Sequence, residues 1–520
     1  MKRRIFKYSN KLITILFTIA ILLSFYFTLV SPNFTLGDTT TPHVIGERTT
    51  IYLTIFLLLL GLFILSLFLY QKWRDTLYKI FVTYGKITAS LLFIAVIFWQ
   101  LLFVFVLHPV IGFDPHAIIS ALSNQKDSEL IGYFSLNTNN LFLLLVLHQL
   151  VLLFHTKTWL FFGLVSLFFT DLSALLNFIT IKILAPKKVV TGIYLHALFL
   201  ASFPMILVPY SDTFVLPFVS LMLLCYAIAF RSGLNVYLKL VFAFLGGISL
   251  SVTYFIKPSA IIPAIAMLIV EVIFLFKPQT TKRIVKTVLV CLVFFGAGSY
   301  LSYQTLNNYV SNQNFIPIQK GRTIPPLHFI SMGMTGDGGY DPKQALAMSR
   351  LDHDQKIAYS KANIKKQLKQ KGFFGYLKFL FFKHQANISD GTFAWLREGN
   401  FIKSKAPDKT WLERFLASFI YPGGKHLADF RYLSQLVWLL ILSLICFGKY
   451  FEPPVAWIQV LKLGLLGGFL YLLIFEGGRS RYLIQFLPLF LLLATFCFTN
   501  AKLWFKRHFS WLMTDINNSK

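Results

Sequence analysis

Acidic side chains are scarce in this 520-residue sequence, which holds 21 Asp and Glu against 49 Lys and Arg. Charged residues of either sign make up only 13% of the chain. Because soluble domains carry about 25% charged residues, this shortage excludes a soluble globular protein. Hydrophobic residues make up 56% of the chain, and the mean hydropathy is +0.65.

Cysteine and the common catalytic signatures are also scarce or absent. The four cysteines (Cys225, Cys291, Cys446 and Cys497) all lie in apolar runs, so no disulfide framework is indicated. The sequence holds no Walker motif, no GxSxG, no HExxH and no dinucleotide fingerprint. Nothing in the chain therefore predicts a site for a soluble nucleotide.

Long apolar runs are what the sequence has in abundance. Many of them can cross a hydrocarbon layer of about 30 Å, so we expect an all-α polytopic membrane protein with about 12–14 transmembrane helices. The candidate segments lie near 11–31, 51–70, 88–108, 141–155, 158–170, 172–185, 191–208, 213–230, 239–255, 258–276, 286–303, 433–449, 455–474 and 481–500. The first segment lacks a small-residue cleavage site, so we expect an uncleaved helix rather than a signal peptide.

The basic residues favour one orientation of these spans. If the N-terminus is cytoplasmic and the spans alternate, four basic groups fall on the inside, as the positive-inside rule requires. They are Lys72, Arg74, Lys79 and Lys86; Lys187 and Lys188; Lys277, Lys282, Arg283 and Lys286; and Lys502, Lys506 and Arg507. The net charge of +28 fits this bias, together with attraction to anionic lipid, and it also fits an acidic substrate such as a lipid phosphate. A nucleic-acid partner is not expected, because the basic residues are divided among short loops.

The same alternation divides the chain into three parts. We expect a transmembrane core over 1–303 with an outer loop at 109–140, an extracytoplasmic domain over 304–431, and C-terminal helices with a basic cytoplasmic tail over 432–520. The outer face then carries Asp38, Asp114, Asp212 and Glu476. Within the outer domain we expect a glycine-rich turn (332–342), a helix from Pro342 to Lys371, and a phenylalanine-rich helix over 373–388 that lies on the membrane or docks against the spans.

Asp114 is the most conspicuous carboxylate, in "HPVIGFDPHAII" just past an apolar run. The plainer interpretation is an N-cap for the short helix that Pro115 begins. The functional interpretation is a catalytic carboxylate at the membrane surface, with His116 beside it. The two are compatible, because a capping carboxylate can still face a substrate.

Two further outer turns carry the same ambiguity. Asn139 and Asn140 in "SLNTNN" either cap the next helix or hydrogen-bond a polar ligand. Tyr210 and Asp212 in "VPYSDT" either form an Asx-type turn or contribute an aromatic and a carboxylate to a site.

Cations at the outer face point to an anionic ligand. Lys257 in "YFIKPSA" either snorkels to the interface or provides a point charge for a phosphate. Arg479 and Arg481 run against the positive-inside bias, and arginine forks match phosphate oxygens. They lie in "FEGGRSRYLIQFLP" with Glu476 and Tyr482.

With these motifs the chain resembles the GT-C class of integral membrane glycosyltransferases, in particular the Gram-positive cell-envelope branch. The similar strings are "GFDPHA", the Asn-Asn pair, "PYSDT", "IKPSA", "MGMTG…GGYD", "DGTFAW…EG" and "RSRYLIQFLP", spread over roughly residues 85–500. The chain departs from that pattern in two ways. Its early loop has one acidic residue in the motif instead of an Asp/Glu pair, and an extra helix pair (11–70) precedes the matching region.

The resemblance implies a GT-C-like multi-helical core that uses a polyprenyl-phosphate-linked sugar donor. The acceptor is a cell-envelope glycan or a teichoic-acid-type polymer outside the plasma membrane, and both chain termini are cytoplasmic. Asp114 is the implied general base, and the donor phosphate is held by Lys257, Arg479, Arg481 and Tyr482. From the motifs themselves we expect substrate contacts at His116, Asn139, Asn140, Tyr210, Asp212, Asp390 and Glu476. The stretch with Asp390, Trp395 and Glu398 either forms ordinary turns or contacts an acceptor sugar by stacking and hydrogen bonds. No dense carboxylate–histidine cluster demands a metal, although some members of the class use a divalent ion.

A transporter or flippase, or a polymerase of lipid-linked glycans, is the competing interpretation. Transporters usually carry charged residues near the bilayer midplane and show internal repeats. Here the polar residues gather at one expected face, and no repeat is visible. This distribution favours the transferase.

Overall fold

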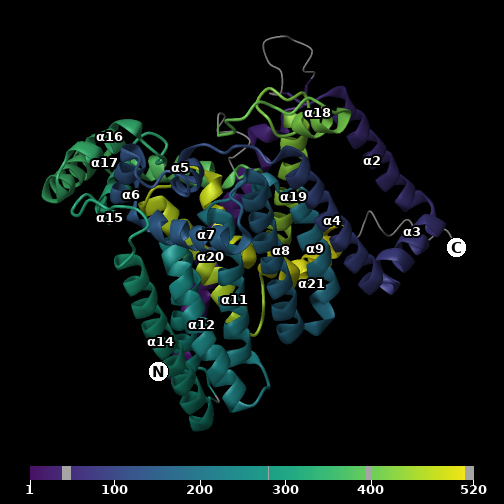
Figure 1. The fold of residues 1–520 in the computed structure, drawn as a ribbon. Coiled ribbons are helices and arrows are strands. Elements are labelled where there is room, and N and C mark those ends of the chain that lie inside the picture. Colours follow the sequence, from purple (N-terminus) through teal and green to yellow (C-terminus); the bar gives the residue numbers. More distant parts are fainter. Residues whose placement is uncertain (38–47, 279, 394–400, 510–520) are drawn as a thin grey trace.

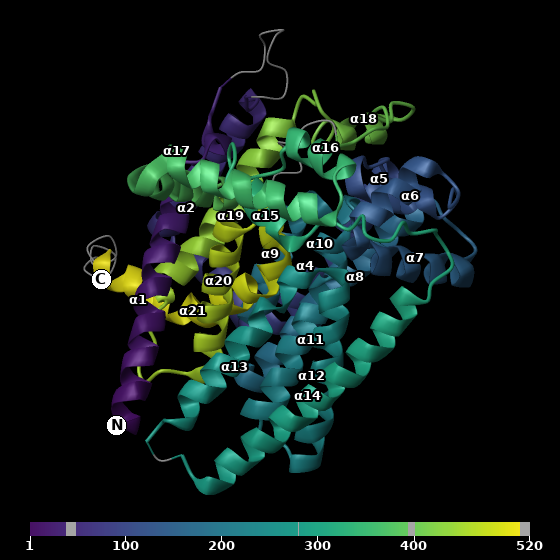
Figure 2. The same cartoon turned by 90° about the vertical axis from the view of Figure 1, so that its left-hand side faces the viewer.

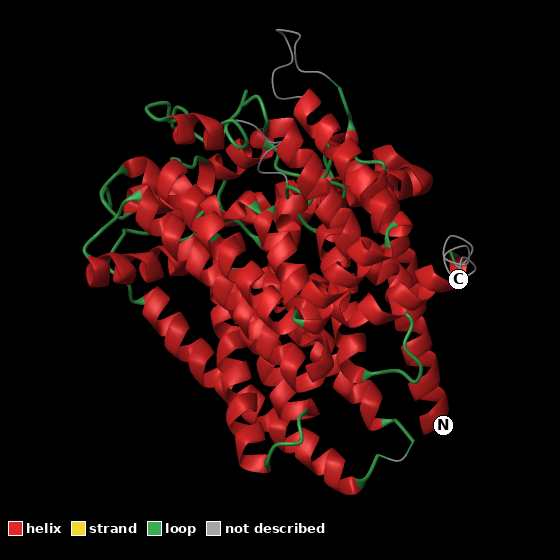
Figure 3. Cartoon of the chain, turned by 90° about the vertical axis from the view of Figure 1, so that its right-hand side faces the viewer, coloured by secondary structure: helices red, strands yellow, loops and turns green. Residues whose placement is uncertain are grey.

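The fold is almost entirely helical (Figure 3). We describe it from a computed structural model, which covers residues 1–37, 48–278, 280–393 and 401–509. Within those residues no strand forms, and the one β-bridge joins Ile111 to Ile402. The expected all-α membrane protein is confirmed.

The helices divide into those that build the bundle and those outside it. The bundle consists of α1 (Lys2–Leu29), α2 (Ile51–Leu69), α4 (Gly85–Leu107), α8 (Trp159–Leu184), α9 (Val189–Ala201), α11 (Leu216–Tyr226), α12 (Val236–Ile256), α13 (Ile262–Leu275), α14 (Lys282–Ser311), α19 (Leu427–Gly448), α20 (Ala456–Ile474) and α21 (Leu487–His508). The remainder are α3 (Gln71–Tyr78), α5 (Phe113–Ala121), α6 (Ser128–Leu136), α7 (Leu141–Phe154), α10 (Ser211–Phe214), α15 (Pro326–Met332), α16 (Pro342–Arg350), α17 (His353–Ile388) and α18 (Trp411–Ala417).

Eleven helices in the described residues are long and apolar enough to cross a membrane, or twelve if the bent pair α6–α7 counts as one span. The count of fourteen candidate segments is therefore too high. Two of the three segments expected between 141 and 185 are one continuous helix, the 26-residue α8. The third is α7, which has only 14 residues and is bent by 98° against α6.

Polar residues inside α8 explain the wrong split. Thr170, Asp171 and Ser173 resemble a loop in the sequence, but in the structure they are buried within the helix. The Thr170 hydroxyl donates to the carbonyl of Ser166 at 2.8 Å, and Ser173 Oγ lies 2.7 Å from Ser220 Oγ on α11. Satisfied in this way, polar side chains do not end a membrane helix.

Most helices of the bundle run side by side, and most of the other helices gather at one end of it, whereas α2 and α3 lie apart at one side (Figures 1 and 2). We call the end with α5, α6 and α15–α18 the site face, and the other end, which holds the N-terminus, the opposite face. Figure 2 shows α17 lying across the site face. Its ring contacts with the spans hold it there: Phe381 meets Phe27 at 4.8 Å, and His384 meets Phe469 at 5.1 Å between centroids.

The expected helices of the outer segment form with shifted ends. The first is divided into α16 and the start of α17, because Asp352 forms a capping box that begins a new helix. The expected break near 372 is present as a kink at Gly372, where φ is +59°. The part beyond the kink docks against α1 and α20, which is one of its two expected positions.

Candidate functional site

The loop that carries Asp114 is fixed by its backbone to the segment that follows residue 400. The Gly112 N–H donates to the carbonyl of Phe401 at 2.5 Å, and the Lys403 N–H donates to Val110 at 2.7 Å. A Cβ on Gly112 would lie 2.5 Å from Cε of Lys403 and 3.3 Å from the Phe401 carbonyl oxygen, so the two segments are closely packed here. Asp114 follows in the first turn of α5.

Asp114 does not cap this helix, so the capping interpretation is wrong. The N-cap position is Gly112, and no side chain caps the helix. Instead each carboxylate oxygen of Asp114 accepts one phenol hydrogen bond, from Tyr133 at 2.8 Å and from Tyr210 at 2.8 Å. Two tyrosines from separate segments therefore fix the orientation of the half-buried carboxylate.

The asparagine pair extends this network. Asn140 is buried and donates to the Tyr133 hydroxyl at 2.6 Å, while the exposed Asn139 donates to the Asn140 side chain at 3.3 Å. Asn140 occupies the N-cap position of α7 but makes no capping bond with its side chain. Tyr133 was not predicted as a site residue, because in the sequence it is only a tyrosine in the same loop as Asp114.

Tyr210 links Asp114 to the second outer turn. Burial, followed by the negative charge of Asp114, raises the pKa of Tyr210 well above its usual value. The charges of Asp212 and Arg481 also act on this phenol, which places both residues nearby. Tyr210 therefore stays protonated and donates its hydrogen to Asp114.

Lys257 pairs with Asp212 instead of snorkelling. The two side chains form an ion pair, with Lys257 12% and Asp212 1% exposed. The ammonium also lies 5.6 Å from the ring centre of Tyr482. The second carboxylate oxygen of Asp212 is buried and has no hydrogen-bond partner in the described residues, an arrangement that suits a donor group on a ligand.

Tyr482 connects this pair to the cluster before α21. Its hydroxyl donates to Glu476 at 2.5 Å and accepts a bond from Arg481 at 3.2 Å. The Arg481 guanidinium also lies 4.9 Å from the Tyr482 ring centre. This cluster begins in the loop after α20 and continues into the 3₁₀ helix η8 (Ser480–Phe486).

Tyr340 joins the Asp114 network to this cluster. The pKa of this half-exposed phenol is raised by its partial burial and by the charges of Asp114 and Glu476, and lowered by that of Arg479. A Cβ at the neighbouring Gly339 would lie 3.5 Å from Arg479 Nε. We therefore define the site cluster as Asp114, Tyr133, Asn140, Tyr210, Asp212, Lys257, Tyr340, Glu476, Arg479, Arg481 and Tyr482. Tyr340 was also missed in the sequence, where it was only part of the glycine-rich turn.

A buried lysine holds the two loops that carry Tyr340 and Glu476. Lys383 on α17 donates to the carbonyls of Gly333 at 2.5 Å, Phe475 at 2.6 Å and Leu473 at 3.2 Å. The Gly477 N–H also donates to the Gly338 carbonyl at 2.8 Å. Gly338 has φ of +86°, and a Cβ there would lie 2.5 Å from the Lys383 side chain, so this packing requires glycine.

Some residues that were expected to contact substrate lie outside the site cluster. His116 is exposed and stacks on Trp159, with ring centres 6.4 Å apart. Asp390 is buried and accepts bonds from Asn33 at 2.8 Å and from the Thr392 hydroxyl at 2.7 Å. The expected acceptor residues Trp395 and Glu398, and the outer-face residue Asp38, lie outside the described residues.

Across the described residues, no group of three His, Cys, Asp or Glu side chains is arranged to hold a metal ion. The carboxylates of the site cluster instead meet phenols and cations. We assign no residue to a metal.

Comparison with known proteins gives one match. The sequence model of a family described as "Conserved hypothetical integral membrane protein" matches residues 5–502. No curated protein matches the chain, and neither does any solved structure. The match covers the spans and the whole site cluster, and it agrees with the helical membrane architecture. The chain therefore belongs to this family of integral membrane proteins.

Proposed function

We propose that this protein is a membrane glycosyltransferase. It moves a sugar from a polyprenyl-phosphate donor to an extracytoplasmic acceptor of the cell-envelope glycan or teichoic-acid type. The observation that carries the proposal is the site cluster, in which an oriented carboxylate lies near two arginines at one face of a membrane bundle. The resemblance to the GT-C class supplies the reaction type.

Asp114 is the proposed general base. Each of its oxygens accepts one phenol hydrogen bond and keeps a further lone pair for the acceptor hydroxyl. As Asp114 takes the hydroxyl proton, the acceptor oxygen attacks the anomeric carbon and the bond from that carbon to the donor phosphate breaks. A positioned general base contributes about 10²–10⁴-fold to such a rate.

The arginines are the proposed phosphate contacts. The leaving lipid phosphate carries negative charge, and a guanidinium fork binds two of its oxygens at once. We assign this role to Arg479 and Arg481, with Tyr482 fixing Arg481. Because Lys257 is already paired with Asp212, we assign it a secondary role in holding that carboxylate beside the site.

We infer the orientation of the site face from the distribution of basic residues. The basic groups around Lys72, Lys187, Lys277 and Lys502 favour a cytoplasmic position for the opposite face. The site face is then extracytoplasmic, where a lipid-linked donor is available and soluble nucleotide sugars are not.

One experiment separates this proposal from the flippase alternative. The purified protein is reconstituted into vesicles with a radiolabelled polyprenyl-phosphate hexose and a cell-envelope acceptor. A transferase converts label into acceptor-linked product in proportion to the protein present. A flippase moves the labelled lipid between leaflets without such a product, and that outcome would overturn the proposal.

A further inference from the structure

A second polar group lies at the opposite face, away from the site cluster. Helices α13 and α14 and the end of the π-helical turn η6 (Ala227–Arg231) surround a pocket of about 250 Å³. Its lining includes Arg231, Glu271, Lys277, Thr280, Ile284 and Val288. Single π-helical turns often occur at functional sites, and this one ends at Arg231.

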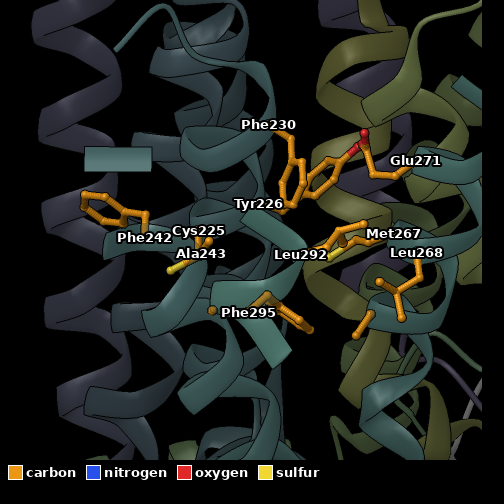
Figure 4. Close-up of a pocket in the computed structure, with 12 residues that line it drawn as sticks. Cys225, Tyr226, Phe230, Phe242, Ala243, Met267, Leu268, Glu271, Leu292 and Phe295 are labelled. Atoms are coloured by element: carbon orange, nitrogen blue, oxygen red, sulfur yellow. The ribbon is translucent and has the colours of Figure 1, made fainter. Parts of the chain in front are cut away.

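A small apolar hollow lies beside this pocket. Glu271 lines both, and the apolar hollow, with a volume of only about 10 Å³, is also lined by Tyr226, Leu268 and Phe295. Figure 4 shows Tyr226 and Glu271 meeting at one end, with Leu268 and Phe295 toward the other. Leu268 is 42% exposed on the membrane span α13, so this side of α13 faces lipid. The pocket is therefore the polar end of a region that is apolar along α13.

Arg231 retains hydrogen-bonding capacity at the polar end. It forms an ion pair with Glu271, which is 3% exposed, and the Tyr226 hydroxyl donates to the same carboxylate at 2.6 Å. Its bonds to Tyr226, Glu271 and the Phe230 carbonyl occupy four of its five N–H groups. Within the described residues, one N–H of the guanidinium, whose side chain is 20% exposed, remains for a ligand.

The mouth of the pocket is strongly positive. Lys277 lines it, and Lys282, Arg283 and Lys286 follow on the first turns of α14. Between residues 271 and 290 the only acidic residue is Glu271, which Arg231 already neutralises. Each cation near a membrane surface attracts anionic lipid by about 1 kcal/mol. The mouth therefore suits a negatively charged headgroup.

We propose that this pocket binds the headgroup of an anionic phospholipid of the bilayer. The headgroup phosphate lies between Arg231 and Lys277, and the acyl chains extend over the lipid-facing side of α13 past Leu268. A free anion would use only the mouth, whereas a zwitterionic lipid would gain little from the surplus cations. The proposal does not depend on the transferase activity, because none of these residues belongs to the site cluster.

The test is lipid binding to delipidated full-length protein, followed by native mass spectrometry. Phosphatidylglycerol, phosphatidylcholine and inorganic phosphate are compared as probes. The variants are Lys277→Ala, which removes a mouth cation, and Ile284→Trp, which fills the pocket from a side chain that is 51% exposed. The matched control is Lys506→Ala, a cation of α21 that does not line either hollow. Gel filtration confirms that each variant is folded.

The proposal predicts tighter binding of phosphatidylglycerol than of phosphatidylcholine. Lys277→Ala should weaken that binding about fivefold, the effect of one surface cation. Ile284→Trp should abolish it, and Lys506→Ala should leave it unchanged. Equal binding of both lipids, binding of inorganic phosphate alone, or equal losses in Lys277→Ala and Lys506→Ala would each overturn the proposal.

Discussion

At the scale of single residues, Asp114 gains its orientation from partners that are distant in sequence. Tyr133 and Tyr210 each occupy one carboxylate oxygen. The sequence places Asp114 and Tyr210 in outer turns but gives no sign that they touch, because that contact depends on how α5 meets α10. Local sequence patterns likewise predicted helix caps at Asp114 and Asn140. In the structure these side chains form hydrogen bonds with residues outside their own helix instead.

Loss of the Tyr210 phenol tests this orientation. In Tyr210→Phe the carboxylate keeps its Tyr133 bond and loses the other, and a hydrogen bond to a charged group contributes about 1.5–3 kcal/mol. We expect the sugar-transfer rate to fall at least about tenfold. The matched control is Tyr237→Phe, a phenol 78% exposed on α12. Equal rates in both variants would contradict the positioning role.

Lys383 gives a pH-dependent prediction for stability. Burial lowers the pKa of Lys383 from 10.5 to about 8. The unfolded chain therefore binds more protons than the folded one between these pH values, so stability rises as pH increases from about 8 to 10.5. Thermal unfolding in detergent should show this rise in the wild type and a smaller one in Lys383→Met. The exposed Lys378→Met serves as control, and an unchanged rise in Lys383→Met would contradict the assignment.

At the scale of elements, most spans were predictable because membrane helices are long apolar runs. α8 was an exception, because its buried Thr170 bonds to a carbonyl of the same helix and its buried Ser173 bonds to α11, so neither ends the span. The extent of α14 was also underestimated, since it continues to Ser311, beyond the apolar stretch that ends near 303. Polarity in the sequence marks a loop only when no neighbouring helix satisfies it.

The crossing of α12 and α14 depends on glycine. A Cβ at Gly298 would lie 2.2 Å from the Phe244 carbonyl oxygen, whereas a Cβ at Gly296 would meet nothing within 4 Å. Gly298→Ala should separate the helices and lower stability by about 1–3 kcal/mol. Gly296→Ala, two residues away, should leave stability unchanged or slightly higher. Equal unfolding temperatures for the two variants would contradict the claim that the crossing requires glycine at position 298.

At the scale of the whole molecule, the sequence predicted the membrane class and the residues that meet at one face. Asp114, Asp212, Lys257 and Glu476 are separated by up to several hundred positions, yet contacts through Tyr210 and Tyr482 place them in one cluster.

The proposed orientation is tested by cysteine labelling. All four native cysteines are buried and can be replaced before single cysteines are introduced. A membrane-impermeant maleimide should label Asp408→Cys on intact cells, and should label Lys282→Cys only after the membrane is opened. The reverse pattern would place the site cluster in the cytoplasm and would contradict the use of an extracytoplasmic acceptor.

The most direct test of the central claim is the sugar-transfer rate of Asp114→Asn in reconstituted vesicles. The substitution keeps the shape of the side chain and removes its charge, and Asp354→Asn on the exposed start of α17 is the matched control. If Asp114 is the general base, its variant should lose about 10²-fold or more of the rate while the control retains it. Equal transfer by Asp114→Asn and the wild type would contradict the account.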